Sequence, residues 1–113
     1  VYLGAATGQK VFYTTPLKAL SNQKYHNFCA QFGTSRVGLL TGDVALNRDA
    51  ATIVVMTTEV YRNLLYDATD RSLAGVHSVV LDEFHYMGDA DRGTAWEESV
   101  IHTPPRVLLL ALS

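Results

Sequence analysis

The stretch Val79-Val80-Leu81-Asp82-Glu83-Phe84-His85 joins an apolar run directly to two carboxylates and, one residue later, an imidazole. An uninterrupted apolar run predicts a strand that is covered on both faces of a parallel sheet. Open α/β sheets bind ligands at the carboxyl ends of such strands, which is where Asp82, Glu83 and His85 would lie. Adjacent buried carboxylates are costly without a partner or a metal, so the stretch indicates a functional site.

Two acids at a strand end suit phosphate chemistry. One carboxylate can hold Mg²⁺, which neutralises phosphate oxygens, and the other can orient or deprotonate an attacking water. Zinc is the competing chemistry. However, Asp-Glu-x-His lacks the spaced histidine pair of H-E-x-x-H, and the single Cys29 supplies no cysteine cluster.

Apolar runs and helical spacing alternate along the whole chain. Helical spacing predicts one helix that starts at Thr15-Pro16, with Thr15 as N-cap and Pro16 in the first helical position, and stops at Gly33. Further helices are predicted over 58–66 and 94–102. Short runs rich in Val, Ile and Leu predict strands over residues 11–14, 37–40, 53–56, 77–82 and 106–112. This alternation predicts βαβ units and therefore an α/β fold with a mainly parallel sheet.

The bulk composition sets limits on the class of protein. The chain has 113 residues, enough for one domain or part of one, and its 48% hydrophobic content is that of a globular protein. A net charge of -2 gives no overall attraction to nucleic acid, so any such contact must come from a local surface. The lone Cys29 excludes an internal disulfide and favours a reducing, cytoplasmic location, with nucleus or organelle left open. No apolar stretch reaches membrane-spanning length, and the chain does not start with Met, so we expect no membrane association and a longer parent chain.

Three more turns follow predicted strands and should meet Asp82 at one edge of the sheet. The first turn lies in residues 14–20, where a strand runs into a helix. The start of that helix and Lys18 could attract a phosphate, although ordinary helix capping and a solvated lysine explain these residues equally well. The second, Thr41-Gly42-Asp43, allows close approach of backbone to a ligand but is a common turn. At the third, Thr57 and Thr58 could cap a helix or bind a sugar-phosphate backbone, and capping is the simpler explanation.

In this order and spacing, the motifs together resemble the first RecA-like domain of a superfamily-two helicase of the DExH type, and most closely the superkiller-like RNA helicases. Residues 14–24 resemble motif Ia, 41–43 resemble motif Ib, 56–59 resemble the following strand-contacting motif, 82–85 resemble motif II, and 92–98 also match the group. The resemblance implies a RecA-like (P-loop NTPase) three-layer sandwich, present in part. Because G-x-x-x-x-G-K-[ST] is absent, residues 1–113 would run from after motif I to the start of motif III.

The resemblance also implies ATP and Mg²⁺ as cofactors and gives roles to individual residues. Asp82, Glu83 and His85 would be the catalytic residues: Asp82 would bind Mg²⁺ through water, and Glu83 would activate the hydrolytic water. His85 would link the nucleotide site to the nucleic acid and, with Ser113, to a second RecA-like domain. The backbone of one nucleic-acid strand would be gripped by Thr15, Pro16, Leu17, Lys18, Thr41, Gly42, Asp43, Thr57 and Thr58.

The function implied is that of part of an ATP-dependent RNA helicase that moves along a single strand and separates a duplex. Single-stranded RNA, the second RecA-like domain and an RNA-processing or decay complex are the implied partners. Without a phosphate-binding loop, the isolated chain should hydrolyse no ATP. Two alternatives stay open: a DNA helicase or translocase with the same motifs, and a non-catalytic nucleic-acid-binding module.

Overall fold

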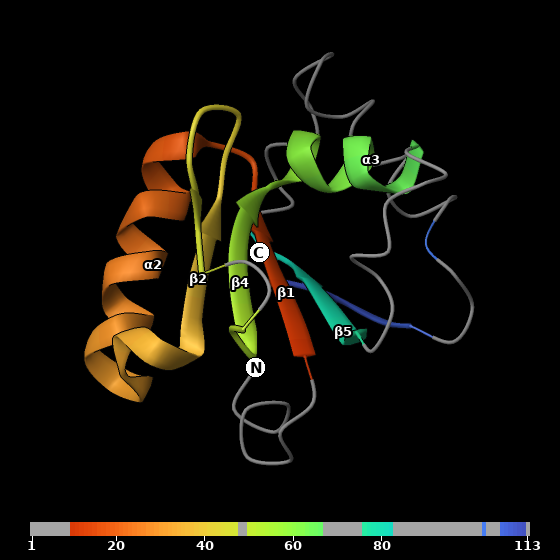
Figure 1. Cartoon of the computed structure of the whole chain (residues 1–113). Coiled ribbons are helices and arrows are strands. Elements are labelled where there is room, and N and C mark those ends of the chain that lie inside the picture. The colour runs from red at the N-terminus through yellow and green to blue at the C-terminus, as the bar shows by residue number, and fades with distance from the viewer. Residues whose placement is uncertain (1–9, 48–49, 67–75, 83–102, 104–106, 113) are drawn as a thin grey trace.

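The described part of the chain in this computed structural model comprises residues 10–47, 50–66, 76–82, 103 and 107–112, and it forms one sheet with helices on both faces (Figure 1). The elements are β1 (Lys10–Thr15), α2 (Lys18–Phe32), the short 3₁₀ helix η1 (Thr34–Arg36), β2 (Val37–Leu40), β3 (Ala45–Leu46), β4 (Ile53–Thr57), α3 (Thr58–Tyr66), β5 (Val76–Leu81) and β6 (Leu108–Ala111). The five predicted strands are thus confirmed, with ends that differ by at most two residues.

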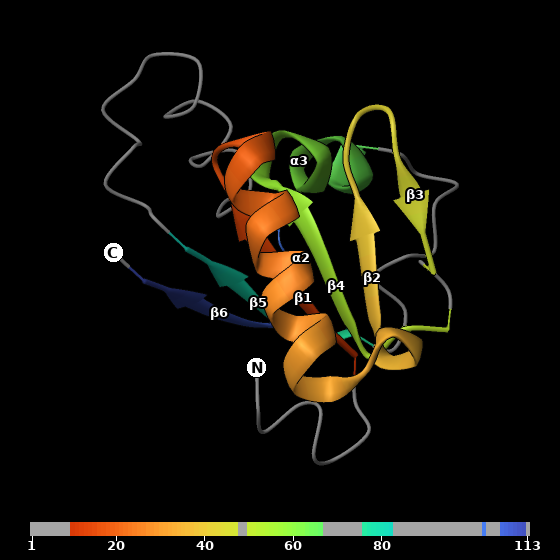
Figure 2. The same ribbon diagram turned by 90° about the vertical axis from the view of Figure 1, so that its left-hand side faces the viewer.

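The strands lie in the order β3-β2-β4-β1-β5-β6, with β1 in the interior of the sheet. Every pairing is parallel except that of β3, which runs antiparallel beside β2 at one edge (Figure 2). The predicted parallel sheet is therefore confirmed. The sequence did not indicate β3, because two exposed residues are too few to show a period.

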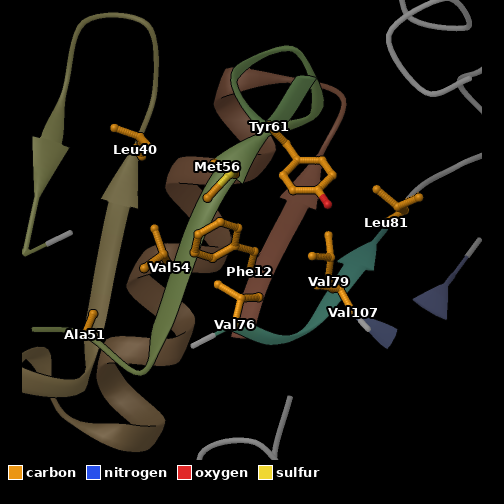
Figure 3. Close-up of a cluster of buried hydrophobic side chains, with 10 residues drawn as sticks. All are labelled: Phe12, Leu40, Ala51, Val54, Met56, Tyr61, Val76, Val79, Leu81 and Val107. Carbon is orange, nitrogen blue, oxygen red and sulfur yellow. The ribbon is translucent and has the colours of Figure 1, made fainter. Parts of the chain in front are cut away.

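The core has two halves because successive side chains of a strand point to opposite faces of the sheet. One face packs against Tyr25, Phe28, Cys29 and Phe32 of α2. The other face packs against α3 and forms the cluster of Phe12, Leu40, Ala51, Val54, Met56, Tyr61, Val76, Val79, Leu81 and Val107 (Figure 3). Helices on both faces explain why the strand sequences show almost no polar alternation.

The start of α2 differs from the prediction. The helix begins at Lys18, after an extended Leu17 with no side-chain cap, so the assignment of Thr15 as N-cap and Pro16 as first helical residue was wrong. Thr15 instead ends β1, because a residue before proline is forced toward extended backbone. Its hydroxyl donates to the Leu17 carbonyl oxygen at 2.9 Å and shares a 2.8 Å hydrogen bond with Ser21 Oγ.

The other predicted helix boundaries have mixed outcomes. Gly33 ends α2 as predicted: its φ of 93° is in a region that favours glycine, and its N–H donates to the Cys29 carbonyl at 2.9 Å. The helix predicted over 58–66 is confirmed as α3. The helix predicted over 94–102 lies outside the described residues. No helix within the described ranges has the length and apolar character needed to cross a membrane.

Candidate functional site

The carboxyl ends of β1, β2 and β4 lie together, since these strands are parallel neighbours. The turns that follow them surround one pocket of about 330 Å³. Its lining residues are Pro16, Leu17, Lys18, Thr41, Gly42, Thr57, Glu59, Val60 and Asn63. The structure therefore brings together residues from all three turns that the sequence analysis singled out beside the acidic stretch.

An ion pair joins two of these turns. The Lys18 ammonium lies 2.6 Å from Asp43 Oδ2, and the two side chains are 53% and 64% exposed. Thr41 Oγ1 donates to the other carboxylate oxygen, Asp43 Oδ1, at 3.0 Å. The hydrogen bond from Lys18, followed by that from Thr41, lowers the pKa of Asp43 below its ordinary value. The turn after β1 and the turn after β2 are thus held together by charge as well as by the sheet.

The third turn combines a structural role with access to the pocket. Thr57 Oγ1 accepts a hydrogen bond from the Val60 N–H at 3.3 Å, which caps the start of α3. Thr57 also lines the pocket, whereas Thr58 is buried beside it. Of the residues predicted to contact nucleic acid, Thr15, Asp43 and Thr58 are not part of the pocket wall.

Gly42 is open to the outside. A Cβ added to Gly42 would meet no heavy atom within 4 Å. The free space lets a ligand approach the backbone of this turn closely. Lys18 is the one cation among the described residues that line the pocket, and Glu59 supplies a negative charge to the same wall.

Asp82 lies at the carboxyl end of β5, on the other side of β1 from β4. Its N–H donates to the Thr14 carbonyl at 2.9 Å, and its carboxylate oxygen Oδ2 accepts a hydrogen bond from the Tyr13 hydroxyl. Thr14 Oγ1 adds a 2.9 Å hydrogen bond to the Val80 carbonyl. The ends of β1 and β5 are therefore joined by both main-chain and side-chain bonds. Glu83, His85 and Ser113 lie outside the described residues.

The Asp82 carboxylate is a group of the kind that holds Mg²⁺ in proteins. The described ranges contain no group of three or more His, Cys, Asp or Glu side chains that could hold a metal ion. Structural zinc and calcium sites need several protein ligands. Mg²⁺ instead keeps water molecules and is held by one or two carboxylates together with substrate phosphates. A carboxylate at a strand end suits the second arrangement.

The sequence profile of the DEAD/DEAH box helicase family matches residues 3–113. The chain belongs to this family. It is 54% identical over 113 residues to the DExH-box ATP-dependent RNA helicase DExH15 chloroplastic of Arabidopsis thaliana, covering 96% of this chain and 10% of that protein. It is 46% identical over 104 residues to the antiviral helicase SKI2 of Saccharomyces cerevisiae, covering 92% of this chain and 8% of that protein. The predicted relation to DExH-type, superkiller-like helicases is confirmed, and the chain spans about a tenth of the length of these relatives.

The fold of this family member is also found in solved helicase structures. The structure of the Escherichia coli DEAH/RHA helicase HrpB superposes with a TM-score of 0.74 at 19% identity, covering 93% of this chain and 14% of HrpB. At that identity the likeness concerns the fold alone. It confirms the RecA-like α/β architecture predicted from the sequence.

Two residues of the pocket wall, Val60 and Asn63, were not predicted from the sequence. They line the pocket beside Glu59 of the 56–59 motif, and helical spacing after Thr57 is a signal that could have placed them on one face of α3. The bond between Tyr13 and Asp82 had no such signal. It depends on the register of β1 against β5, which a single sequence does not show.

Proposed function

We propose that the chain is part of the first RecA-like domain of an ATP-dependent RNA helicase. The parent protein would couple ATP hydrolysis to movement along a single strand and to duplex separation. Family membership supports this proposal, as do the names of relatives that share about half of their residues with the chain over the matched region. The observation that carries it is the open pocket built from three strand ends, with the carboxylate of Asp82 one strand away.

The pocket would hold the backbone of one nucleic-acid strand. Lys18 would contact a phosphate, while the hydroxyls of Thr41 and Thr57 and the backbone of Gly42 would contact phosphate or ribose oxygens. Such contacts position a strand without reading its bases, which suits an enzyme that moves along any sequence. Asp43 would compete with a phosphate for Lys18, because its carboxylate already contacts the ammonium group and repels a second anion placed beside it.

The nucleotide would bind at the end of β5. Asp82 would hold Mg²⁺ through water, and Glu83 would orient and deprotonate the attacking water. When bound, Mg²⁺ would neutralise charge on the phosphate oxygens. His85 and Ser113 would contact the second RecA-like domain, which lies elsewhere in the proposed parent. The parent protein would act inside the cell, in an RNA-processing or decay complex. The name of one matched relative, superkiller complex protein 2 of Mus musculus, supports a place in a complex.

Replacing Glu83 by Gln in the full-length protein tests the enzymatic part of this proposal. Glu83→Gln keeps the size of the side chain and removes the base, so ATP should still bind while strand-stimulated hydrolysis falls by about a hundredfold or more. Phosphate release should be measured with single-stranded RNA, with single-stranded DNA of the same sequence, and without nucleic acid. Retained hydrolysis in the variant would refute the assigned role of Glu83. Equal stimulation of the unmodified protein by DNA would refute the preference for RNA.

A further inference from the structure

Tyr13 is a buried tyrosine whose hydroxyl reaches an acid of the proposed nucleotide site. The residue is 5% exposed and lies in β1 on the sheet face that α2 covers. Its ring packs edge-on against Phe28, with ring centroids 5.0 Å apart and an interplanar angle of 83°. The hydroxyl donates a hydrogen bond to Asp82 Oδ2, across 69 positions of sequence. The ring is therefore fixed by packing, and the polar tip points at one carboxylate.

The surrounding main chain fixes the geometry of this pair. Tyr13 lies opposite Val80 in the register of β1 and β5, so Asp82 is its diagonal neighbour on the same face. The Asp82 N–H donates to the Thr14 carbonyl at 2.9 Å, and Thr14 Oγ1 donates to the Val80 carbonyl at 2.9 Å. Neither strand can shift along the other without breaking these bonds. The position of the Tyr13 hydroxyl relative to Asp82 is thus set by the sheet.

A hydrogen bond to one oxygen determines what the other oxygen of a carboxylate can do. An ionised carboxylate only accepts hydrogen bonds, and it has two oxygens with which to do so. Because Tyr13 occupies Oδ2, the rotation of the Asp82 carboxylate is restricted and Oδ1 keeps a defined direction. Carboxylates that bind metals commonly depend on such outer partners for their orientation.

We propose that Tyr13 is a positioning residue that orients Asp82 for the Mg²⁺-bound nucleotide. The inference rests on the proposed function, since it takes Asp82 as the acid that meets the metal. In this role Tyr13 would act only through the Asp82 carboxylate, to which its hydroxyl is bonded. Removing the Tyr13 hydroxyl should therefore weaken Mg²⁺-dependent nucleotide binding and leave the affinity for a nucleic-acid strand unchanged.

The test compares two tyrosine variants of the full-length protein. Tyr13→Phe removes the hydroxyl and keeps the ring that packs on Phe28. Tyr61→Phe is the matched control: Tyr61 is 0% exposed, and its hydroxyl shares a 2.7 Å hydrogen bond with Thr103 Oγ1 on the other face of the sheet. Both variants remove one buried hydroxyl, but only one of the two hydroxyls contacts Asp82.

The measurement is a Mg²⁺ titration of the binding of a fluorescent, non-hydrolysable ATP analogue. For Tyr13→Phe we expect the half-saturating Mg²⁺ concentration to rise about threefold, less than the tenfold or more for an outer partner of a direct metal ligand, because Asp82 would meet the metal through water. Tyr61→Phe should titrate like the unmodified protein. Affinity for the analogue in EDTA, and for oligouridylate without nucleotide, should be the same in all three proteins.

A double-mutant comparison shows whether the effect acts through Asp82. Once Asp82→Asn has removed the carboxylate, adding Tyr13→Phe should cause no further loss of Mg²⁺-dependent binding. A further loss of the same size in that background would overturn the proposal, as would an unchanged Mg²⁺ titration in Tyr13→Phe alone. If the unmodified protein binds no nucleotide with Mg²⁺, the proposed function fails instead.

Folding is checked by thermal unfolding of each variant. If Tyr13→Phe does not fold, 4-fluorophenylalanine at position 13 replaces it. The fluorine fills the place of the hydroxyl but donates no hydrogen bond to Asp82, so the half-saturating Mg²⁺ concentration should rise as it does for Tyr13→Phe. An unchanged concentration would overturn the proposal.

Discussion

Replacing Lys18 by Met should change how strand binding depends on salt. Lys18 is the one cation among the described residues that line the pocket, so under the proposed function the variant would lose one ionic contact with a phosphate. Each such contact with a single strand adds about 0.7 to the slope of log affinity against log salt concentration. The slope for Lys18→Met should therefore be shallower by about 0.7, so a fourfold rise in salt should weaken its binding about 2.6-fold less than it weakens the unmodified protein.

Replacing Asp43 by Asn should raise the affinity for RNA. In Asp43→Asn the Lys18 ammonium has no carboxylate partner at 2.6 Å, so a phosphate no longer competes for it. The affinity for RNA should rise by about threefold to tenfold at low salt, because one nearby negative charge is removed and the cation is freed. Asp43→Glu keeps the charge within reach of Lys18 and serves as the matched control, which should bind like the unmodified protein.

Fluorescence anisotropy with labelled oligouridylate, measured on the full-length protein over a series of salt concentrations, gives both quantities. The decisive comparison is Asp43→Asn in the Lys18→Met background, where most of the gain in affinity should disappear. If the full gain persists without Lys18, Asp43 acts by general repulsion and the exchange between carboxylate and phosphate is refuted. An unchanged salt slope in Lys18→Met would mean that this lysine touches no phosphate.

The remaining predictions concern glycines and pH. Gly42→Ala should leave the free energy of unfolding unchanged, because its Cβ meets nothing within 4 Å, yet lower RNA affinity; Gly38→Ala places a Cβ 2.8 Å from the Asn47 and Leu46 carbonyl oxygens and should lower stability by about 1–3 kcal/mol in urea unfolding. Equal stability of the two variants would refute this contrast. Burial raises the pKa of Tyr61 above its ordinary value of 10.0, an effect that its hydrogen bond with Thr103 partly opposes. The folded state therefore favours the neutral phenol of Tyr61, and the stability gained from this is complete below pH 10.0 and is lost as the pH rises through the folded pKa. Above pH 10.0, the melting temperature of the unmodified protein should fall more steeply with pH than that of Tyr61→Phe. Parallel curves for the two proteins would contradict this prediction.

The sheet and its order of elements were predictable because burial on both faces leaves a direct mark on the sequence. Apolar runs such as Ile53–Thr57 have no polar alternation, and the segments between them have helical spacing. The start of α2 was missed because two local rules conflict at Thr15. Threonine favours the N-cap position, but the following proline forces extended backbone, and pairing with Thr57 in β4 adds to that preference.

The sequence predicts which turns form the candidate site, but it does not predict the side-chain contacts within it. Strand ends that share an edge can be inferred from a parallel topology, which is why Lys18, Thr41 and Thr57 were expected near one another. The pairing of Lys18 with Asp43 depends on side-chain reach across two strands. The contact of Tyr13 with Asp82 depends on register. The local pattern of residues predicts neither the reach of a side chain across two strands nor the register of paired strands.

The central place of β1 constrains how two ligands could influence each other. This strand is bonded to β4 on one side and β5 on the other; it leads into the pocket through Lys18 and contacts Asp82 through Tyr13. Hydrogen bonds on both sides prevent β1 from sliding, so a ligand bound at one site cannot affect the other site through a shift of this strand. Rotation of side chains at the carboxyl end of β1 is a route that remains for coupling the proposed RNA and nucleotide sites, and by linkage any such coupling acts equally in both directions.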